Sequence, residues 1–371
     1  MPFRIASVSL RDFRNYRDME LENLGQIVVF AGPNATGKTN LVEGMQLLTA
    51  LESFRNPKTN ELIGWGREKA KLSAQLVDDE RTLDVALLLD ARGRHYYKNG
   101  KQRPRLELQG VLPAVFFSPD DLQLVKGAPD IRRRAIDMLG SQVSRNYAAV
   151  KRDYDRLLRQ KNRLLKDEAS ENYLASVNEL LVRIGGQLFR YRMHILKTLR
   201  EVLPVQHDQI TAHAGVLSLE CTPSFQDEPL NDELIAAYED DREKVENALQ
   251  EALERRHQEE HRRQTSLVGP HRDKFSFALD ARAAADFASQ GQQRSIAIAY
   301  KLAELEMIEH MTHVKPVLFL DDVMSELDEN RRARLVENLQ SAAQTFITTT
   351  NLDYFHADFL ERAQIISLPF K

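Results

Sequence analysis

The chain has 371 residues, which is long enough for two compact units of ordinary domain size, and its single cysteine excludes an internal disulfide. No apolar run approaches the roughly 18 residues that a membrane-spanning helix needs, and the amino-terminal residues lack the layout of a signal peptide. We therefore expect a cytoplasmic protein without a membrane partner, and the net charge of −4 argues against coating of nucleic acid by bulk charge.

The first part of the chain is predicted to form strands around one helix. Residues 3–10 alternate apolar and polar side chains like a half-buried strand, and residues 26–31 form an apolar run typical of a strand buried on both faces. A helix is predicted over residues 38–51. Because Asn99-Gly100 is a strong hairpin signal, the strands before it predict an antiparallel flank. These strands are predicted at 72–77, 82–89 and 94–98.

Between residues 119 and 264 the pattern becomes helical. Interruptions are expected near Pro204 and between Gly215 and Pro229, where breakers gather. The segment therefore predicts an inserted α-helical lobe. Its long charged amphipathic segments lie at 146–166, 172–203 and 231–263.

Basic residues are concentrated at the start of this insert. From Lys126 to Lys166 there are twelve lysines and arginines and four acids, a net charge of +8, whereas residues 227–251 are strongly acidic. Counterion release would make the binding of duplex DNA by such a segment steeply salt-dependent. The alternatives are an ordinary solvated helical face, or arginines that pin the lobes or a dimer. The candidate DNA contacts are Arg132, Arg133, Arg134, Lys151 and Arg152.

The last third of the chain returns to alternating strands and helices. The simplest architecture is an α/β lobe formed by residues 1–118 with 265–371, discontinuous in sequence, and a second lobe formed by residues 119–264. Strands are predicted at 274–279, 317–320, 345–348 and 365–368, and helices at 290–310 and 329–342.

A phosphate-binding loop is predicted between the apolar strand and the first helix. The segment matches G-x-x-x-x-G-K-[ST] in the strand–loop–helix context that the motif requires. In such a loop the backbone N–H groups point at phosphate oxygens, Lys38 neutralises the β and γ phosphates of ATP, and Thr39 ligates Mg²⁺. The matching residues are Gly32, Pro33, Asn34, Ala35, Thr36, Gly37, Lys38 and Thr39.

An acidic pair follows the apolar strand at 317–320. Asp321 stands at the exit of a buried strand, where a carboxylate can hold the Mg²⁺ that Thr39 also ligates. Asp322 points differently and is the candidate general base for the attacking water. The alternative for Asp322 is a solvated acid at a strand end.

A second anion site is predicted where the helix at 290–310 begins. Ser289 is a good N-cap and a glutamine stands three residues further on, so the segment on its own reads as a capping box. Together with the other motifs the phosphate-binding interpretation is favoured, because a glycine allows close backbone approach at an exposed helix N-terminus. The candidate residues are Ser289, Gln290, Gly291 and Gln292.

Ser289 to Gln293 is similar to the signature loop of ABC-type ATPases, and Ser325-Glu326-Leu327-Asp328 resembles their D-loop. The chain as a whole resembles the RecF family of bacterial recombination-repair proteins, which is grouped with Rad50 and SMC heads. The resemblance extends almost from end to end. It is carried by Leu10 to Tyr16, Gly37-Lys38-Thr39-Asn40, Ser118 to Leu122, Gly127 to Arg134, Gly269-Pro270-His271-Arg272-Asp273, and Asp321 to Asp328.

The resemblance implies an ABC-type P-loop ATPase head with a mixed sheet and an antiparallel flank, and an inserted α-helical lobe. It implies an ATP-dependent homodimer in which each signature loop and Asp328 reach the nucleotide of the other subunit, with Arg14, Asn15 and Asn40 near the nucleotide. It further implies ATP-controlled binding of double-stranded DNA and gap junctions. RecR is the implied partner, with RecO and RecA acting downstream in the loading of RecA at single-strand gaps.

Two departures from ABC transporters predict slow hydrolysis, and we expect this hydrolysis to depend on Mg²⁺ and to be stimulated by DNA. Transporters usually have glutamate where this chain has Asp322, and histidine where it has Thr349 and Thr350. The remaining alternatives are another SMC- or Rad50-like clamp, a small-molecule P-loop kinase, a transporter ATPase and a non-enzymatic binding module. ATP-dependent dimerisation would exclude the kinase.

Overall fold

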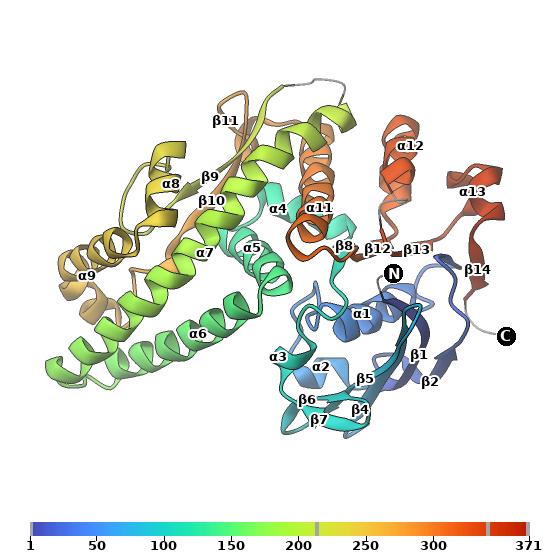
Figure 1. Ribbon diagram of the computed structural model, residues 1–371, viewed down its shortest axis with the longest axis horizontal. Coiled ribbons are helices and arrows are strands. Elements are labelled where there is room, and N and C mark those ends of the chain that lie inside the picture. Colours follow the sequence, from blue (N-terminus) through green and yellow to red (C-terminus); the bar gives the residue numbers. More distant parts are fainter. Residues whose placement is uncertain (1–2, 212–214, 339–341, 369–371) are drawn as a thin grey trace. The chain divides into compact units, whose positions relative to one another are not determined.

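The computed structural model describes residues 3–211, 215–338 and 342–368. The chain divides into two compact units: Met1–Asp121 with Glu304–Lys371, which we call the nucleotide unit, and Leu122–Ala303, which we call the helical unit. The helix α11 (Gln290–Thr312) begins in the helical unit and ends in the nucleotide unit. The α/β class, with a mostly helical insert, agrees with the predicted fold (Figure 1).

A fully parallel five-stranded sheet forms one layer of the nucleotide unit, with the order β14-β3-β13-β12-β8. Its strands β12 and β13 are buried along their whole length, as expected for parallel strands covered on both faces. The strands are β3 (Ile27–Ala31), β8 (Ala114–Phe117), β12 (Val317–Asp321), β13 (Gln344–Thr349) and β14 (Gln364–Ser367).

An antiparallel six-stranded sheet forms a second layer, with the order β2-β1-β4-β5-β6-β7. Asn99 and Gly100 form its last turn with positive φ angles of 48° and 72°, as a tight hairpin of this kind requires. This sheet is the predicted antiparallel flank. Its strands are β1 (Arg4–Phe13), β2 (Tyr16–Leu21), β4 (Ala70–Val77), β5 (Thr82–Asp90), β6 (Gly93–Lys98) and β7 (Lys101–Arg103).

The helix α1 (Lys38–Thr49) lies between these two sheets and contacts strands of both. It is buried from Leu41 to Thr49, and Gly44 lets it approach β1 closely, since a Cβ there would lie 2.9 Å from a methyl carbon of Leu10. The phosphate-binding loop is therefore followed by a helix that is fixed on both sides. The short elements around this core are α2 (Thr59–Leu62), α3 (Arg105–Leu108), η1 (Pro119–Asp121), η3 (Val323–Glu326), α12 (Glu329–Asn338), η5 (Leu352–Tyr354) and α13 (Ala357–Glu361).

The helical unit contains a small sheet, β11-β10-β9, that the sequence patterns did not reveal completely. The strand β9 lies in the predicted interruption between Gly215 and Pro229, and it pairs with β10 along its whole length. Its strands are β9 (Leu217–Thr222), β10 (Lys274–Leu279) and β11 (Arg282–Ala283). Its helices are α4 (Leu122–Lys126), α5 (Pro129–Val143), α6 (Arg145–Lys166), α7 (Glu171–Thr211), α8 (Asp232–Asp240), α9 (Arg242–Arg263) and α10 (Ala284–Phe287), with η2 (Pro270–Arg272).

Two predictions about the insert differ from the structure. The second boundary of the helical unit falls at Ala303 instead of residue 264, because β10 pairs with β9 and contacts α5. The helix predicted to end near Pro204 continues to Thr211, with Pro204 inside α7. A proline removes one backbone hydrogen bond, and the buried residues beyond it, such as Ile210, continue the apolar face of this helix. The predicted end of the helix at 329–342 lies beside residues 339–341, outside the described part of the chain.

The motif Gly269-Pro270-His271-Arg272-Asp273 lies in the helical unit, where its aspartate takes part in a buried ion-pair network. Asp273 is fully buried and contacts the guanidinium of Arg192 at 3.2 Å, while its second carboxylate oxygen accepts from the Ser224 N–H at 3.0 Å. Arg192 also donates two hydrogen bonds of 3.0 Å to Asp137. Burial raises the pKa of Asp273 to about 6, although Arg192 opposes this shift. One arginine thus joins α5, α7 and the motif.

The histidine of the motif is neutral for a physical reason. Burial lowers the pKa of His271 to about 3. Its Nε2 lies 3.2 Å from the Ser266 carbonyl and its Nδ1 lies 2.6 Å from the Tyr154 hydroxyl, so Nε2–H donates and Nδ1 accepts. Gly269 has φ of 129°, and a Cβ there would collide with the same tyrosine hydroxyl at 2.3 Å. The motif is therefore linked to α6 through Tyr154 and to α7 through Arg192.

Candidate nucleotide-binding site

The phosphate-binding loop connects β3 to α1 at the carboxyl edge of the parallel sheet, the edge where ligands bind in open α/β folds. Ala35 and Gly37 have positive φ angles of 64° and 101°, which turn successive N–H groups toward one side of the loop. At Gly32 a Cβ would lie 2.2 Å from the Leu368 carbonyl oxygen, so this position requires glycine. The loop residues Pro33, Asn34 and Ala35 are exposed, and the Thr36 hydroxyl donates to the Pro33 carbonyl at 2.9 Å.

Two side chains of the β1–β2 turn support the end of this loop. The amide of Asn15 lies so close to Gly37 that a Cβ there would be 2.4 Å from it, and the same side chain accepts from Asn40 at 2.7 Å. The Tyr16 hydroxyl donates to the Gly37 carbonyl at 3.1 Å. Burial raises the pKa of Tyr16 to about 12, so this donor keeps its proton. The structure therefore brings Asn15 and Asn40 to the predicted nucleotide loop.

Lys38 is almost fully buried at the start of α1. Its ammonium donates to the carbonyls of Gly32 at 2.7 Å and Pro33 at 2.8 Å, so it lies beneath the loop. Burial lowers the pKa of Lys38, and the carboxylates of Asp322 and Asp321 oppose this shift. A buried ammonium near two acids is suited to neutralising phosphate charge.

Three side chains from three elements meet at Asp321. The hydroxyl of Thr39 donates to Asp321 Oδ1 at 3.0 Å, and the hydroxyl of Thr348 donates to the same oxygen at 2.7 Å. Asp321 is 5% exposed, and burial raises its pKa, while the two hydroxyls and the guanidinium of Arg55 lower it. Thr39 and Asp321 are thus placed as a pair of oxygen ligands that suits Mg²⁺.

Asp322 adopts a left-handed conformation with φ of 53°, and its N–H donates to the Thr348 hydroxyl at 3.0 Å. Its carboxylate oxygen Oδ1 is buried, and no hydrogen-bond partner for it is found in the described part of the chain. Burial raises the pKa of Asp322, whereas Lys38 lowers it. A buried acceptor without a protein donor is a suitable position for orienting a water molecule.

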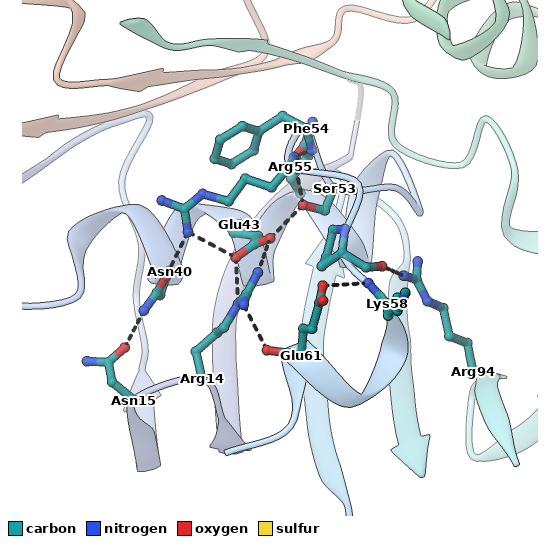
Figure 2. A network of polar contacts seen from close by, with 12 residues as sticks. Arg14, Asn15, Asn40, Glu43, Ser53, Phe54, Arg55, Lys58, Glu61 and Arg94 are labelled. Atoms are coloured by element: carbon teal, nitrogen blue, oxygen red, sulfur yellow. Dashed lines mark hydrogen bonds and ion pairs between the residues drawn. The ribbon is translucent and has the colours of Figure 1, made fainter. Parts of the chain in front are cut away.

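A polar network centred on Glu43 holds this edge together (Figure 2). Glu43 is fully buried in α1, and its carboxylate accepts two hydrogen bonds of 3.0 Å from Arg14 and one of 2.6 Å from Ser53. Arg55 contacts Glu43 at 3.5 Å and donates to Asn40 at 3.0 Å. A buried carboxylate requires such partners, because an unpaired buried charge is strongly destabilising.

Arg14 was predicted to lie near the nucleotide, and the network shows which protein groups it contacts. Its third guanidinium nitrogen donates to the Glu61 carbonyl at 2.7 Å, so all three nitrogens contact protein groups. A direct nucleotide contact by Arg14 stays a prediction. Arg55, Glu43 and Thr348 were not predicted from the sequence, because none belongs to a contiguous motif.

The predicted signature loop lies in the helical unit at the start of α11. Ser289 and Gln292 form the reciprocal capping box: the Ser289 N–H donates to the glutamine side chain at 2.8 Å, and the Gln292 N–H donates to the serine hydroxyl at 3.3 Å. Both Ser289 and Gln290 are exposed. For the N–H groups of Gln290 and Gly291, no partner is found among the residues that the structure describes. The capping box therefore leaves these two backbone N–H groups as available donors at the N-terminus of α11.

The predicted D-loop ends in an N-cap. Asp328 is exposed, accepts from the Arg331 N–H at 2.9 Å and forms an ion pair with the Arg331 side chain at 2.7 Å. Ser325, four residues after Asp321, donates to the Asp322 carbonyl at 2.8 Å and ties this turn to the acidic pair.

The five residues that were predicted to contact DNA differ in how far they are buried. Arg132 is 8% exposed and donates to the carbonyls of Phe275, Leu124, Val125 and Gly127, so it closes the end of α4 and is not a surface residue. Arg133 donates to the Asp273 carbonyl at 2.7 Å. Lys151 pairs with Asp155 at 2.5 Å, whereas Arg134 and Arg152 are exposed.

Of the helices that the structure describes, none is both long enough and apolar enough to cross a membrane.

Comparisons with known proteins match the chain over almost its full length. Residues 4–364 match the family model described as RecF/RecN/SMC N terminal domain. The DNA replication and repair protein RecF of Gloeobacter violaceus is 36% identical over 371 residues, covering 98% of this chain and 96% of that protein. The protein of the same description from Lactobacillus gasseri is 35% identical over 355 residues, with coverages of 94% and 93%.

A solved structure of the recombination mediator protein RecF-ATP in the RecFOR pathway has the same fold. Its TM-score is 0.84 at 29% sequence identity, and the match covers 96% of this chain and 94% of that chain. The likeness therefore includes both units and is not confined to the nucleotide-binding motifs.

Proposed function

The chain belongs to the RecF/RecN/SMC family, and from this premise we propose that it is a RecF-type ATPase of DNA repair and recombination, switched by ATP between separate and paired subunits. The observation that carries the proposal is the meeting of Thr39, Asp321 and Thr348, from α1, β12 and β13, beside the phosphate-binding loop. Contiguous motifs alone do not produce this arrangement. It requires the strand order β3-β13-β12.

We assign the hydrolytic roles as follows. The N–H groups of the loop and the ammonium of Lys38 bind the β and γ phosphates, and Thr39 and Asp321 hold Mg²⁺. The ion, when bound, neutralises phosphate charge. Asp322 orients the attacking water through its otherwise unpartnered oxygen, and burial raises its pKa, which makes the carboxylate a stronger base. Its short side chain supports slow turnover, as expected of a switch.

ATP-dependent dimerisation explains the exposed signature loop. A helix N-terminus with donors lacking described partners binds anions well, and Ser289 to Gln292 would reach the γ-phosphate held by a second copy. Asp328 would lie in the same interface. ATP then joins two subunits, and its hydrolysis releases them.

Replacing Asp322 by asparagine is expected to lower the hydrolysis rate by about 10²- to 10⁴-fold while ATP binding and pairing persist. The variant removes the base but keeps the shape of the side chain. Mass by light scattering, with and without ATP and Mg²⁺, should give a monomer-to-dimer change for both the unmutated protein and Asp322→Asn. Ser289→Arg should abolish the change. If the mass never responds to ATP, the start of α11 is only a helix cap and the dimer proposal fails.

We propose that duplex DNA lies along a basic stripe of α6. The stripe residues are exposed and recur at intervals of three, four or seven positions, which places them on one helical face. Two of them form only exposed pairs, Arg152 with Asp153 and Arg163 with Asp167, and such pairs contribute little. The stripe consists of Arg145, Arg152, Arg156, Arg159, Arg163 and Lys166.

The double variant Arg156→Gln/Arg159→Gln is expected to weaken binding of duplex DNA and to reduce the slope of log K against log salt by about 2, since each phosphate contact contributes about 0.9. Neither arginine has an ion-pair partner within the described ranges, so the fold should tolerate both changes. Fluorescence anisotropy at several salt concentrations measures the slope. Arg92→Gln, in the exposed β5–β6 turn, is the control. An unchanged slope in the double variant rules out the stripe.

We further propose that ATP and DNA stimulate each other's binding, that RecR is the direct protein partner, and that RecO and RecA act downstream at single-strand gaps in the cytoplasm. The family membership supports these assignments, and the RecFOR pathway is the context of the related RecF-ATP structure. Co-sedimentation with purified RecR, with and without ATP, tests the partner.

A further inference from the structure

Two imidazoles and one carboxylate meet in the helical unit, where the start of α7 lies beside the last turns of α9. The Nε2 atom of His257 lies 2.9 Å from one oxygen of Glu171, and the Nε2 atom of His261 lies 3.5 Å from the other. One potential ligand atom from each of the three residues lies within 4.8 Å of the others. None of these residues belongs to the nucleotide loop, the acidic pair or the basic stripe.

The backbone fixes the cluster. His257 and His261 are four residues apart in α9, so they share one face of the helix, and their ring centroids are 4.6 Å apart. Beside them, Glu260 is 3% exposed and pairs with the buried Lys161 of α6 at 2.6 Å. The last turns of α9 are thus tied to α6, and α6 leads through a short turn to Glu171. The cluster rests on regular helices, not on a long loop.

We propose that Glu171, His257 and His261 bind a divalent cation of the zinc class. Imidazole nitrogens suit Zn²⁺, Cu²⁺ and Ni²⁺, whereas Mg²⁺ and Ca²⁺ prefer sites made of oxygen atoms. Tetrahedral zinc, with bonds of about 2.0–2.1 Å to nitrogen, places its ligand atoms about 3.4 Å apart. The distances of 2.9 Å and 3.5 Å from Glu171 to the two imidazoles lie on either side of this spacing. The three side chains are 32% to 65% exposed, so water completes the coordination.

The charged residues around Glu171, His257 and His261 are compatible with a bound cation. Basic residues flank the histidines along α9, but Glu259 pairs with both Arg256 at 2.6 Å and Arg263 at 2.7 Å, and its negative charge offsets one of these two positive charges. The carboxylate of Glu171 then faces both imidazoles. Its negative charge supplies part of the neutralisation that a divalent ion needs.

The cluster is structural and not hydrolytic. Two histidines four residues apart on a helix resemble half of the H-E-x-x-H motif of zinc hydrolases, in which the glutamate after the first histidine is the general base. This chain has Gln258 at that position, and Glu260 is engaged by Lys161. The bound ion would cross-link the start of α7 to the end of α9.

Calorimetric titration of the full-length protein with Zn²⁺, in excess Mg²⁺ to saturate the nucleotide site, tests the proposal. We expect one Zn²⁺ per chain. His257→Ala, His261→Ala and Glu171→Gln should each weaken binding at least about tenfold, since even the loss of outer partners of a metal ligand costs 10- to 100-fold. His194→Ala is the matched control, because His194 also faces a carboxylate, Glu239 at 2.7 Å, but belongs to no described cluster of three ligands.

A second readout separates a metal site from a set of ion pairs. Zn²⁺ should raise the thermal midpoint of the unmutated protein and of His194→Ala, but not that of the double variant His257→Ala/His261→Ala. Circular dichroism establishes that each variant is folded. Absence of saturable binding, or equal binding by the double variant, overturns the proposal. ATP-dependent dimerisation is measured separately, so neither proposal depends on the outcome of the other.

Discussion

Replacing Lys38 by methionine is expected to lower the rate of ATP hydrolysis by about a hundred- to a thousand-fold, the effect of removing one group that stabilises developing charge in a transition state. The ammonium lies beneath the loop, and burial lowers its pKa, so an anionic phosphate beside it would stabilise its charged form. Phosphate release at saturating ATP measures the loss.

Methionine is chosen because it fills most of the buried volume of the lysine. Lys38 donates to two carbonyls of its own loop, so a change in loop stability must be separated from the loss of chemistry. Thermal unfolding without nucleotide makes this separation. Hydrolysis by Lys38→Met at the unmutated rate would contradict the assignment of the nucleotide site.

The second large effect is expected in the helical unit, where Arg192→Met should lower the free energy of unfolding by about 3–5 kcal/mol. Arg192 is 1% exposed and compensates the carboxylates of Asp137 and Asp273. Its removal leaves the fully buried Asp273 and the partly buried Asp137 without the guanidinium that they share, although Asp137 keeps Lys151 at 3.7 Å. Urea denaturation followed by circular dichroism measures the change.

A compensating variant shows that the loss comes from unpaired charge. Arg192→Met combined with Asp137→Asn and Asp273→Asn should recover a large part of the stability, because neutral amides cost less to bury than carboxylates. If Arg192→Met alone is as stable as the unmutated protein, the arginine is not the centre of this core. ATP-dependent measurements should not be used for this test, since they combine folding with binding.

Contiguous patterns predicted most of the nucleotide unit. The strand before the phosphate-binding loop, the loop itself and α1 follow one another, so their order in space follows from their order in sequence. Thr348 could not be assigned in this way. Its contact with Asp321 depends on β13 lying between β3 and β12, and strand patterns predict strands but not their neighbours.

The basic segment shows the limit of counting charges. Its net charge suggested a DNA-binding surface, yet Arg132 closes a helix end and Lys161 pairs with Glu260 inside the unit. Helical spacing separates these roles better than composition does, because the exposed residues of α6 share one face. The strand β9 was missed for a similar reason: its partner β10 is far along the chain, and the turn residues around it suggested only an interruption.

The interleaved strand order of the parallel sheet also affects when the sheet can assemble during translation. The strands β3 and β8 leave the ribosome early, but β12 and β13, which lie between them, begin only at Val317 and Gln344. The antiparallel sheet is built from neighbouring segments, and the whole helical unit is synthesised before the missing strands. During translation, β3 and β8 therefore lack their neighbours β13 and β12 until the last part of the chain has been synthesised. Completion of the ATPase core is a late event, and a chain interrupted before β12 has no assembled nucleotide site.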